Sequence, residues 1–398
     1  MSSKRQILIA GAGIGGLTAA LALLQKGFNV MVFEQAKALG EIGAGVQLGP
    51  NGVRVLYALG LKEEVDRLGV EAQAKEVRVW NTGKTWPLFS LGADSLERYG
   101  APYLMMHRAD LHKILLDSVL RIAPNACFTN SRAISFEQDE SGVKLHLENG
   151  RSIVGDVLIG ADGLHSNIRK GLFGPDTPQF TGGCCWRGVI DVTRLPEHLR
   201  RPIGVNWIGA AGHIILYPIR AGKLLNFVGH VEREGWASES WTEEGSHEEL
   251  LQDYRGWHED IQSIVRQIDV PYKWALFLRK PLQEWSKGRV SLLGDACHAT
   301  LPYLAQGANM AIEDGLVLAR ALSDFDDVEV ALQRYESARI ERTTKIVNKS
   351  AENLGRFHNE ALLDPDTADA YVDREWAPEK IRERYEWILS YDAVTATI

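Results

Sequence analysis

The N-terminal run Gly11-Ala12-Gly13-Ile14-Gly15-Gly16 limits the possible folds of this chain more than any other feature. It follows a β-rich stretch, Gln6 to Ala10, and precedes an Ala/Leu-rich stretch, Leu17 to Lys26, which indicates a strand, a tight turn and a helix. In such a GxGxxG turn the glycines permit the sharp bend, the approach of a pyrophosphate and close helix packing. The sequence therefore predicts an α/β, Rossmann-like dinucleotide-binding fold.

The next predicted strand, Phe28 to Phe33, ends in Glu34, about 20 residues beyond the glycines. A carboxylate at this point can accept two hydrogen bonds from the ribose diol of an adenosine that lacks a 2′-phosphate. The predicted dinucleotide contacts are therefore Gly11, Gly13, Gly15, Gly16 and Glu34. The alternative is a glycine loop that only packs a helix on a sheet, and the motif does not choose between NAD and FAD.

Charge and cysteine usage exclude several functional classes. The chain has 44 Lys and Arg against 52 Asp and Glu, a net charge of −8, so we expect no nucleic-acid partner. The uncharged run from Ile7 to Leu24 has almost the length of a membrane span, but its glycines break it, so we expect no membrane segment. No CxxC pair occurs among the cysteines, so neither a disulfide framework nor a zinc ribbon fits, which indicates a cytoplasmic location. These cysteines are Cys127, Cys184, Cys185 and Cys297. Because free cysteines are commonly buried, the adjacent Cys184 and Cys185 are expected to be core residues rather than a vicinal disulfide.

The character of the sequence changes near residue 182, where short β-rich runs broken by Pro and Gly continue to about residue 231. Helical periodicity returns afterwards and again in a long stretch from Ala308 past Leu322. We therefore expect a discontinuous dinucleotide-binding domain with an inserted, mostly antiparallel β-sheet domain and a C-terminal helical tail. The expected bounds are 1–175 with 270–355, 176–269, and 356–398.

Two further motifs stand beside the glycine turn: Gly160-Ala161-Asp162-Gly163, and Gly294-Asp295-Ala296-Cys297-His298 followed by Pro302 and Gly307. Their order and spacing resemble the single-component FAD-dependent aromatic hydroxylases, the group of para-hydroxybenzoate hydroxylase and salicylate hydroxylase. The resemblance extends over about residues 5–355. It implies FAD as cofactor, a Rossmann-like FAD-binding domain and an inserted β-sheet domain that binds the substrate.

The resemblance also assigns cofactor contacts. The backbone of Val46 and Gln47 is expected beside the isoalloxazine, and Arg108 near the phosphate and ribityl chain, unless it is a surface salt-bridge partner. Asp162 is expected to act through the shape of its loop, and Asp295 to accept from a ribitol hydroxyl or to cap a helix. A helix starting at Gly307 or Ala308 directs its positive end towards the flavin N1–C2=O edge.

The reaction implied by this family needs no metal. NADH or NADPH reduces FAD, O₂ adds to form a flavin C4a-hydroperoxide, and that species hydroxylates a phenolic ring. NADH is preferred by analogy alone. The expected partner is a small aromatic acid, and the chain is expected to be a monomer or a homodimer.

His213 is the predicted base that accepts the phenolic proton, with a structural histidine as the alternative. On a strand, residues 213 and 217 face the same way, so Tyr217 is predicted to share the pocket. The other pocket residues expected are Trp186, Arg187, Pro302 and Tyr303. Arg187 and Arg220 are candidates for the substrate carboxylate, and His298 is expected to be structural.

The residue at position 302 of the sequence narrows the choice of substrate. Related 3-hydroxybenzoate 6-hydroxylases carry glutamine where this chain has Pro302, whereas salicylate and 6-hydroxynicotinate hydroxylases carry proline. The sequence thus favours a salicylate-type hydroxylase, with decarboxylative ipso attack giving a catechol as an option. The alternatives are a 3-hydroxybenzoate 6-hydroxylase or a 6-hydroxynicotinate 3-monooxygenase. From other classes, an NAD-dependent dehydrogenase or a non-catalytic FAD-binding protein remains open.

Overall fold

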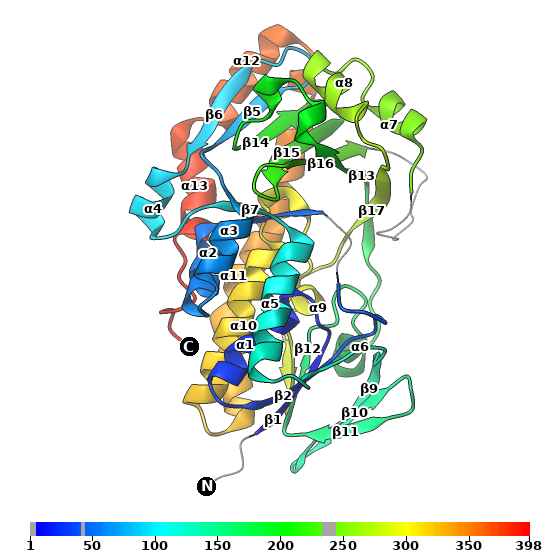
Figure 1. Cartoon of the computed structure of the whole chain (residues 1–398), viewed down its shortest axis with the longest axis vertical. Helices are drawn as coiled ribbons and strands as arrows, with labels where there is room; N and C mark the ends of the chain where they lie inside the picture. Colours follow the sequence, from blue (N-terminus) through cyan, green and yellow to red (C-terminus); the bar gives the residue numbers. More distant parts are fainter. Residues whose placement is uncertain (1–4, 41–43, 233–243) are drawn as a thin grey trace.

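The computed structural model describes residues 5–40, 44–232 and 244–398. A six-stranded sheet, mostly parallel, forms the lower half of the molecule in Figure 1, in the order β18-β19-β12-β1-β2-β8. Its strands are β1 Gln6–Ala10, β2 Asn29–Phe33, β8 Cys127–Phe128, β12 Val157–Gly160, β18 Ser286–Lys287 and β19 Val290–Leu292. Only β18 is antiparallel to its neighbour. This confirms the predicted Rossmann-like half.

The helices of this half pack around α1, Ile14–Gln25, which is buried on almost every side. Because its residues are nearly all Ala, Leu and Gly, α1 fits in the space between α10 on one side and α5 on the other. The two neighbours of α1 are α5 Arg108–Ile122 and α10 Gly307–Asp324. The other helices of this half are α2 Pro50–Ala58, α3 Lys62–Leu68, α4 Ala93–Tyr99, α6 Asn167–Phe173 and α9 Asp295–His298.

Two small antiparallel sheets extend this half. A turn at Asn149-Gly150 joins the last two strands of the first small sheet. The first small sheet contains β9 Ala133–Asp139, β10 Gly142–Leu147 and β11 Ser152–Gly155. The second contains β3 Gly45–Leu48, β4 Val70–Glu71 and β7 Leu104–His107.

A seven-stranded sheet fills the upper half in the order β17-β13-β16-β15-β14-β5-β6 (Figure 1). Its strands are β5 Ala74–Val79, β6 Thr85–Ser90, β13 Gln179–Asp191, β14 Ile203–Ile208, β15 Gly212–Ile219, β16 Leu224–Glu232 and β17 Tyr272–Leu278. Two of them, β5 and β6, come from within the expected 1–175 segment, and β17 lies beyond residue 269. The expected insertion at 176–269 therefore covers only four of the seven strands, because β5 pairs in parallel with β14 across a long sequence gap.

The two faces of the seven-stranded sheet are covered differently. Helices α7 His247–Asp253 and α8 Glu259–Val265 pack on one face through Leu250, Tyr254 and Ile261. The other face lies against the first half of the molecule and the C-terminal tail. Short 3-10 turns complete the connections at Val192–Arg194, Glu197–Leu199, Pro302–Leu304 and Glu360–Leu362.

The C-terminal helices dock on the body of the protein. Helix α11, Val328–Phe357, runs through the expected boundary at 355/356, so that boundary falls inside a continuous helix. Helix α12 is Pro365–Glu375 and α13 is Pro378–Leu389, and both lie within the predicted helical tail. Phe357, Tyr371 and Trp376 are buried in the same hydrophobic cluster as residues of the sheet strands.

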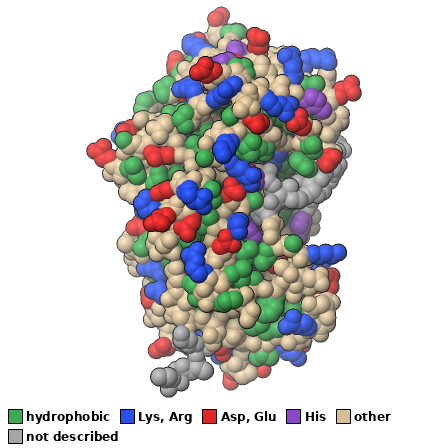
Figure 2. Space-filling model, in the orientation of Figure 1, with side chains coloured by type: hydrophobic (Ala, Val, Ile, Leu, Met, Phe, Trp, Pro, Cys, Tyr) green, Lys and Arg blue, Asp and Glu red, His purple; other side chains and the backbone are tan. Residues whose placement is uncertain are grey.

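Two surface observations complete the description. On the face drawn in Figure 2, acidic and basic side chains are interspersed and do not gather into a single-sign patch. Across the described ranges, no helix is both long and apolar enough to cross a membrane.

Candidate functional site

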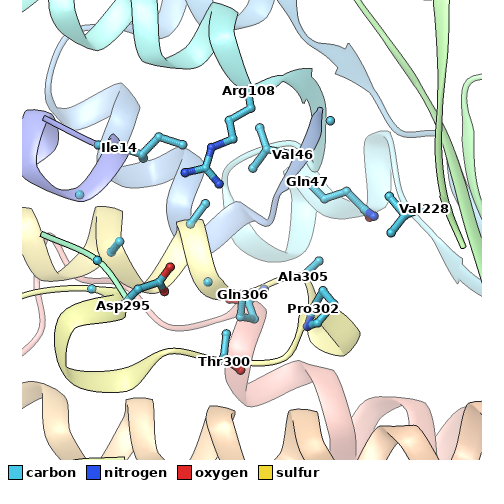
Figure 3. A pocket seen from close by; sticks show the side chains of 18 of the residues that line it. Ile14, Val46, Gln47, Arg108, Val228, Asp295, Thr300, Pro302, Ala305 and Gln306 are labelled. Carbon is cyan, nitrogen blue, oxygen red and sulfur yellow. The ribbon is translucent and has the colours of Figure 1, made fainter. Parts of the chain in front are cut away.

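A central cavity of about 300 Å³ lies where the glycine turn, β3, the start of α5, the 293–311 segment and the seven-stranded sheet meet (Figure 3). It brings together residues that are far apart in the sequence. The predicted site residues that line it are Gly13, Gly15, Gly16, Val46, Gln47, Arg108, Arg187, His213, Tyr217, Asp295, Pro302, Gly307 and Ala308.

A second cavity, which we call the Glu34 cavity, has a volume of about 210 Å³ and is lined by Gly11, Glu34 and Asp162. It shares Gly13, Ala161 and Gly163 with the central cavity. The space therefore continues on both sides of the glycine turn. This shape suits an elongated ligand such as a dinucleotide, whose pyrophosphate would lie at the turn.

Steric contacts divide the glycines of the turn into two groups. A Cβ on Gly11 would lie 2.2 Å from the carbonyl oxygen of Ala161, and one on Gly16 would lie 2.1 Å from that of Gly11. Gly11 also has a φ of +104°, which L side chains rarely adopt. A Cβ on Gly13, by contrast, meets no described atom within 4 Å. Gly11 and Gly16 thus serve the packing of the turn, while Gly13 faces open ligand space.

The Glu34 carboxylate is held by backbone N–H groups. It accepts hydrogen bonds from Ala12 N and Ala36 N, each at 2.9 Å. A carboxylate has about four acceptor sites, so acceptor capacity remains for a ligand in the Glu34 cavity. The residue fits the predicted ribose contact, because its position and its remaining lone pairs both suit a diol.

Asp162 organises the loop around it. Its Oδ2 accepts from Asn167 N at 2.7 Å and from Ile168 N at 3.2 Å, at the start of α6. Burial raises the pKa of Asp162, although its hydrogen bonds oppose that rise. These contacts use the carboxylate within its own loop, consistent with the predicted role through loop shape. From α6, the guanidinium of Arg169 donates to Ala296 O at 3.1 Å and so connects the two later motifs.

Asp295 is exposed and lines the central cavity, with its carboxylate towards the open space in Figure 3. The alternative that it caps the following helix is wrong. Gly294, with a φ of +64°, occupies the N-cap position of α9 and Asp295 is the first residue of the helix. The side chain is therefore placed to accept a hydrogen bond from a ligand hydroxyl.

Helix α10 starts at Gly307, so its free N–H groups and positive end face the central cavity. The residue before its N-cap, Ala305, has a left-handed φ of +54°, which is uncommon for a side chain with Cβ. Further along, Asn309 donates to Gln47 O at 3.1 Å and accepts from Gly49 N at 3.0 Å. This side chain joins β3 to α10 across the cavity floor.

The sheet face at the opposite end of the cavity is set by strand register. His213 pairs with His230, and Ile215 pairs with Val228, which pairs with Arg187. Because side chains alternate along a strand, Arg187, His213 and Tyr217 all point into the cavity. The Tyr217 ring lies on the backbone of Gly45, where a Cβ would come within 2.4 Å of it.

Two predicted pocket residues lie elsewhere. Trp186 is fully buried on the opposite face, where its Nε1 donates to Asp253 Oδ2 at 2.8 Å. The prediction was wrong because neighbours such as Trp186 and Arg187 cannot face the same side of a strand. Tyr303 does not line the central cavity; its ring packs edge-on behind His213 and His230, at 5.3 and 5.2 Å between centroids.

His230 is a cavity residue that the sequence analysis missed. Its ring stacks on His213 with centroids 4.1 Å apart and planes 7° apart. Burial lowers the pKa of both imidazoles well below 6.5, and the proximity of the histidines lowers that of His213 further. The Nε2 atom of His213 is buried and has no hydrogen-bond partner among the described residues. The hydrogen-bonding capacity of Nε2 in a neutral His213, as acceptor or donor, is therefore unused by the described residues.

The two candidate arginines are now distinguished. Arg220 is half exposed and forms an ion pair with Asp110 at 3.3 Å. Arg187 lines the cavity with its guanidinium 4.1 Å from the centre of the Trp274 ring. Burial raises the pKa of Tyr217, although the charge of Arg187 opposes that rise. Arg187 is thus the cation of the sheet end, while Arg108 is the cation nearer the glycine turn.

His298 is not among the residues that line the central cavity. It is fully buried, and its Nε2 lies 2.6 Å from Asp314 Oδ2. The other oxygen of Asp314 accepts from Arg339 at 2.8 Å. Burial favours protonation of Asp314, but His298 and Arg339 outweigh it and hold the pKa of this carboxyl below its usual value.

Several known proteins are similar to this chain. The family described as FAD binding domain matches residues 4–350. A 3-amino-4-hydroxybenzoate 2-monooxygenase of Streptomyces platensis is 37% identical over 98% of this chain and 97% of its own. A 6-hydroxynicotinate 3-monooxygenase of Pseudomonas fluorescens is 36% identical over 90% of this chain and 94% of its own.

Among solved structures, Klebsiella pneumoniae HpxO complexed with FAD and uric acid matches with a TM-score of 0.84 and 27% identity, covering 100% of this chain and 98% of that one. A salicylate hydroxylase substrate complex matches with a TM-score of 0.81 and 26% identity, covering 99% and 97%.

Proposed function

The chain belongs to the FAD binding domain family, and from this premise we propose that it hydroxylates a small phenolic aromatic acid with NADH or NADPH and O₂. The sequence predictions of fold class, of FAD as cofactor and of an FAD-dependent aromatic-ring monooxygenase are confirmed by the family match and the relatives. The alternatives of an NAD-dependent dehydrogenase and a non-catalytic FAD-binding protein are set aside. The substrate and the residue roles are the proposal.

One observation carries the proposal: Arg187 and His213 line the same end of a cavity whose other end is the glycine turn. A guanidinium recognises a carboxylate by charge and by paired hydrogen bonds. A neutral imidazole accepts the proton of a phenol. Together they recognise a ring that carries both groups.

When bound, FAD supplies the hydride and oxygen chemistry of the family. The residues of the protein then bind the aromatic substrate and remove its phenolic proton. Arg187 binds the carboxylate, His213 Nε2 accepts the phenolic proton, and Tyr217, whose pKa burial raises, stays protonated and donates a hydrogen bond to the resulting oxyanion. Ile215 and Val228 cover the same surface with apolar atoms and so exclude water from the ring.

The distance between Arg187 and His213 limits which substrates can reach both residues. Arg187 and His213 are two strands and two residues apart, which places their Cα atoms about 12 Å from each other in a regular sheet. A hydroxyl meta or para to the carboxylate suits this separation better than the neighbouring groups of salicylate. The names of the two relatives contain such rings, 3-amino-4-hydroxybenzoate and 6-hydroxynicotinate. We therefore rank these rings and 3-hydroxybenzoate first, and salicylate, the sequence-based choice, second.

A substrate panel tests the proposal. The holoenzyme is incubated with NADH and 3-hydroxybenzoate, 3-amino-4-hydroxybenzoate, 6-hydroxynicotinate or salicylate, and NADH oxidation, H₂O₂ and product mass are measured. We expect a hydroxylated product from at least one acid of the first group. Benzoate, which lacks the hydroxyl, and phenol, which lacks the carboxylate, serve as matched controls without product. Formation of H₂O₂ alone from every acid would refute the proposal.

A further inference from the structure

The peptide between Ala12 and Gly13, inside the glycine turn, is held from behind by a buried histidine. His112 Nε2 lies 2.8 Å from the carbonyl oxygen of Ala12, and His112 is only 4% exposed. A carbonyl oxygen can only accept, so Nε2 carries the hydrogen and donates it. The glycine turn therefore receives a hydrogen bond from α5, 100 residues later in the chain.

Ala12 is held through its other peptide group as well. Its N–H donates to Glu34 Oε2 at 2.9 Å. Both backbone polar groups of this buried residue are thus engaged within the protein. Two side chains from different elements, one directly after β2 and one in α5, fix the two peptide planes that flank Ala12.

The position of the Ala12 carbonyl determines where the N–H of Gly13 points. A trans peptide is planar, with its C=O and N–H bonds directed to opposite sides. Because the carbonyl is directed at His112, the N–H of Gly13 is directed away from α5. No described residue accepts a hydrogen bond from this N–H, and Gly13 lines both the central cavity and the Glu34 cavity. The N–H is therefore left for a ligand that spans the two cavities.

The helix that carries His112 also carries a residue of the central cavity. Arg108 is the first residue of α5 and lines that cavity, and His112 follows it four residues later. Side chains four residues apart lie on one face of a helix, one above the other. One face of α5 thus serves the dinucleotide site twice, directly through Arg108 and indirectly through His112.

His112 interrupts an otherwise apolar buried face. The other residues that α5 buries around it include Leu111, Ile114 and Leu115. An apolar residue at 112 would also pack in this helix face, but it could not donate a hydrogen bond. Within the described ranges no other group donates to the Ala12 carbonyl oxygen, so the peptide would lose what holds its orientation.

We propose that His112 is a positioning residue for the cofactor, which holds the Ala12 carbonyl and thereby directs the N–H of Gly13 at the pyrophosphate of FAD. His112 does not touch the cofactor itself. A backbone N–H that is already oriented donates to an anion without rearranging when the ligand arrives. The inference goes beyond the proposed function, because it does not depend on which acid is hydroxylated.

The test measures how tightly the holoenzyme holds FAD in His112→Leu and in His112→Gln. The fluorescence of FAD released on dilution gives the dissociation constant. Leucine packs but cannot donate, so we expect it to raise this constant about 10-fold, which corresponds to about 1.4 kcal/mol. Glutamine can place an amide N–H near the same point, so its constant should stay within about threefold of the parent value.

Competing ligands separate the pyrophosphate from the rest of FAD. ADP-ribose carries the same adenosine and diphosphate without the flavin, and adenosine carries no phosphate. Displacement of FAD from the holoenzyme gives the affinity for each. In His112→Leu we expect ADP-ribose to lose the same factor as FAD, and adenosine to bind as it does to the parent. A purely structural role, in which the whole site loosens, would weaken all three ligands.

His146→Leu is the matched control, because it makes the same change at a histidine that lies 2.9 Å from Ser152 in a small sheet, and it should equal the parent. If His112→Leu does not fold, His112→Asn replaces it, since the shorter amide does not reach Ala12 and should show the same loss. Parent-like FAD affinity in the variant without the donor would overturn the proposal, as would an equal loss in His112→Gln or an equal loss for adenosine. Failure of the substrate panel would leave it intact, because none of these measurements uses turnover.

Discussion

The two ends of the central cavity are built from different parts of the polypeptide. At the glycine turn, Gly13, Gly307 and Ala308 line the cavity with backbone atoms and small side chains. Ligand recognition there therefore depends on the path of the backbone. At the sheet end, Arg187 and His213 present side chains from β13 and β15, which strand pairing places on the two sides of β16. The turn can therefore be recognised as a sequence motif, whereas the sheet end becomes visible only once strand pairing is known.

The largest effects are expected at the turn, where Gly16→Ala and Gly13→Ala should separate folding from cofactor binding. A Cβ at Gly16 collides with the Gly11 carbonyl at 2.1 Å, so we expect a loss of about 3 kcal/mol or more in unfolding free energy and little folded protein. A Cβ at Gly13 meets no described atom, so that variant should fold like the parent but bind FAD weakly.

Denaturant unfolding of the FAD-free proteins and FAD titration by fluorescence measure the two quantities. If both variants lost stability equally, the division of the turn into packing and ligand-facing glycines would be wrong.

At the sheet end, His213→Gln should lower the turnover number by about 100-fold with the active acid of the panel, because the general base is lost. FAD binding should stay unchanged, since His213 lies at the end of the cavity away from the glycine turn. Steady-state kinetics and the absorbance of bound flavin give both readings. His198→Gln, at an exposed histidine paired with Asp260, is the control. A variant that keeps parent turnover would show that His213 is only structural.

A smaller change is expected for Arg187→Gln, which should raise KM for the acid by about 30-fold with a modest change in kcat, because a charged hydrogen bond contributes about 2 kcal/mol. Arg220→Gln, whose arginine pairs with Asp110 at the surface, should equal the parent and is the matched control. If the two variants had equal KM values, the carboxylate would have to bind elsewhere, and Arg108 would be the next candidate.

The difference between the ends also explains what the sequence could predict. The strand, turn and helix around Gly11–Gly16, helix α10 and helix α13 follow from local patterns of glycine, proline and apolar spacing, and the structure has them as predicted. The motifs of Asp162 and Asp295 both reach the central cavity, through Ala161 and Gly163 and through Gly294 and Asp295, because each follows a strand of one mostly parallel sheet.

The sequence predictions fail at positions that are determined by strand pairing between distant segments of the chain. Strands β5 and β6 join the upper sheet through a parallel pairing with β14, which local sequence does not encode. Trp186 and Arg187 were both assigned to the pocket, although alternation along a strand places neighbouring residues on opposite faces. His230 was missed because its position beside His213 depends on the register of β15 and β16.

The buried histidines of the sheet end should also make stability depend on pH, by an amount smaller than the effects above. Because the folded-state pKa values of His213 and His230 are lowered, the unfolded chain binds more protons than the native state below pH 6.5. The unfolding free energy should therefore fall as pH drops below 6.5, by at most about 1.4 kcal/mol per pH unit for each histidine.

Urea unfolding of the FAD-free protein at pH 7.5 and 5.5 measures this loss. The double variant His213→Gln/His230→Gln should lose less stability between the two pH values than the parent does. An equal loss would show that other groups cause the acid sensitivity.

The smallest effect is expected for Trp186→Phe, and it tests the assignment of the two faces of β13. The Trp186 ring packs towards Asp253 on the α7 side, so its replacement should leave KM and kcat within about twofold of the parent. Loss of the indole hydrogen bond and of buried area should lower the unfolding free energy by about 1–2 kcal/mol, which urea unfolding measures. Cavity residue Val228→Ala is the matched comparison from the other face and should raise KM with little change in stability. A KM change in Trp186→Phe as large as in Val228→Ala would mean that the register of β13 differs from the one described, and that Arg187 faces away from the substrate.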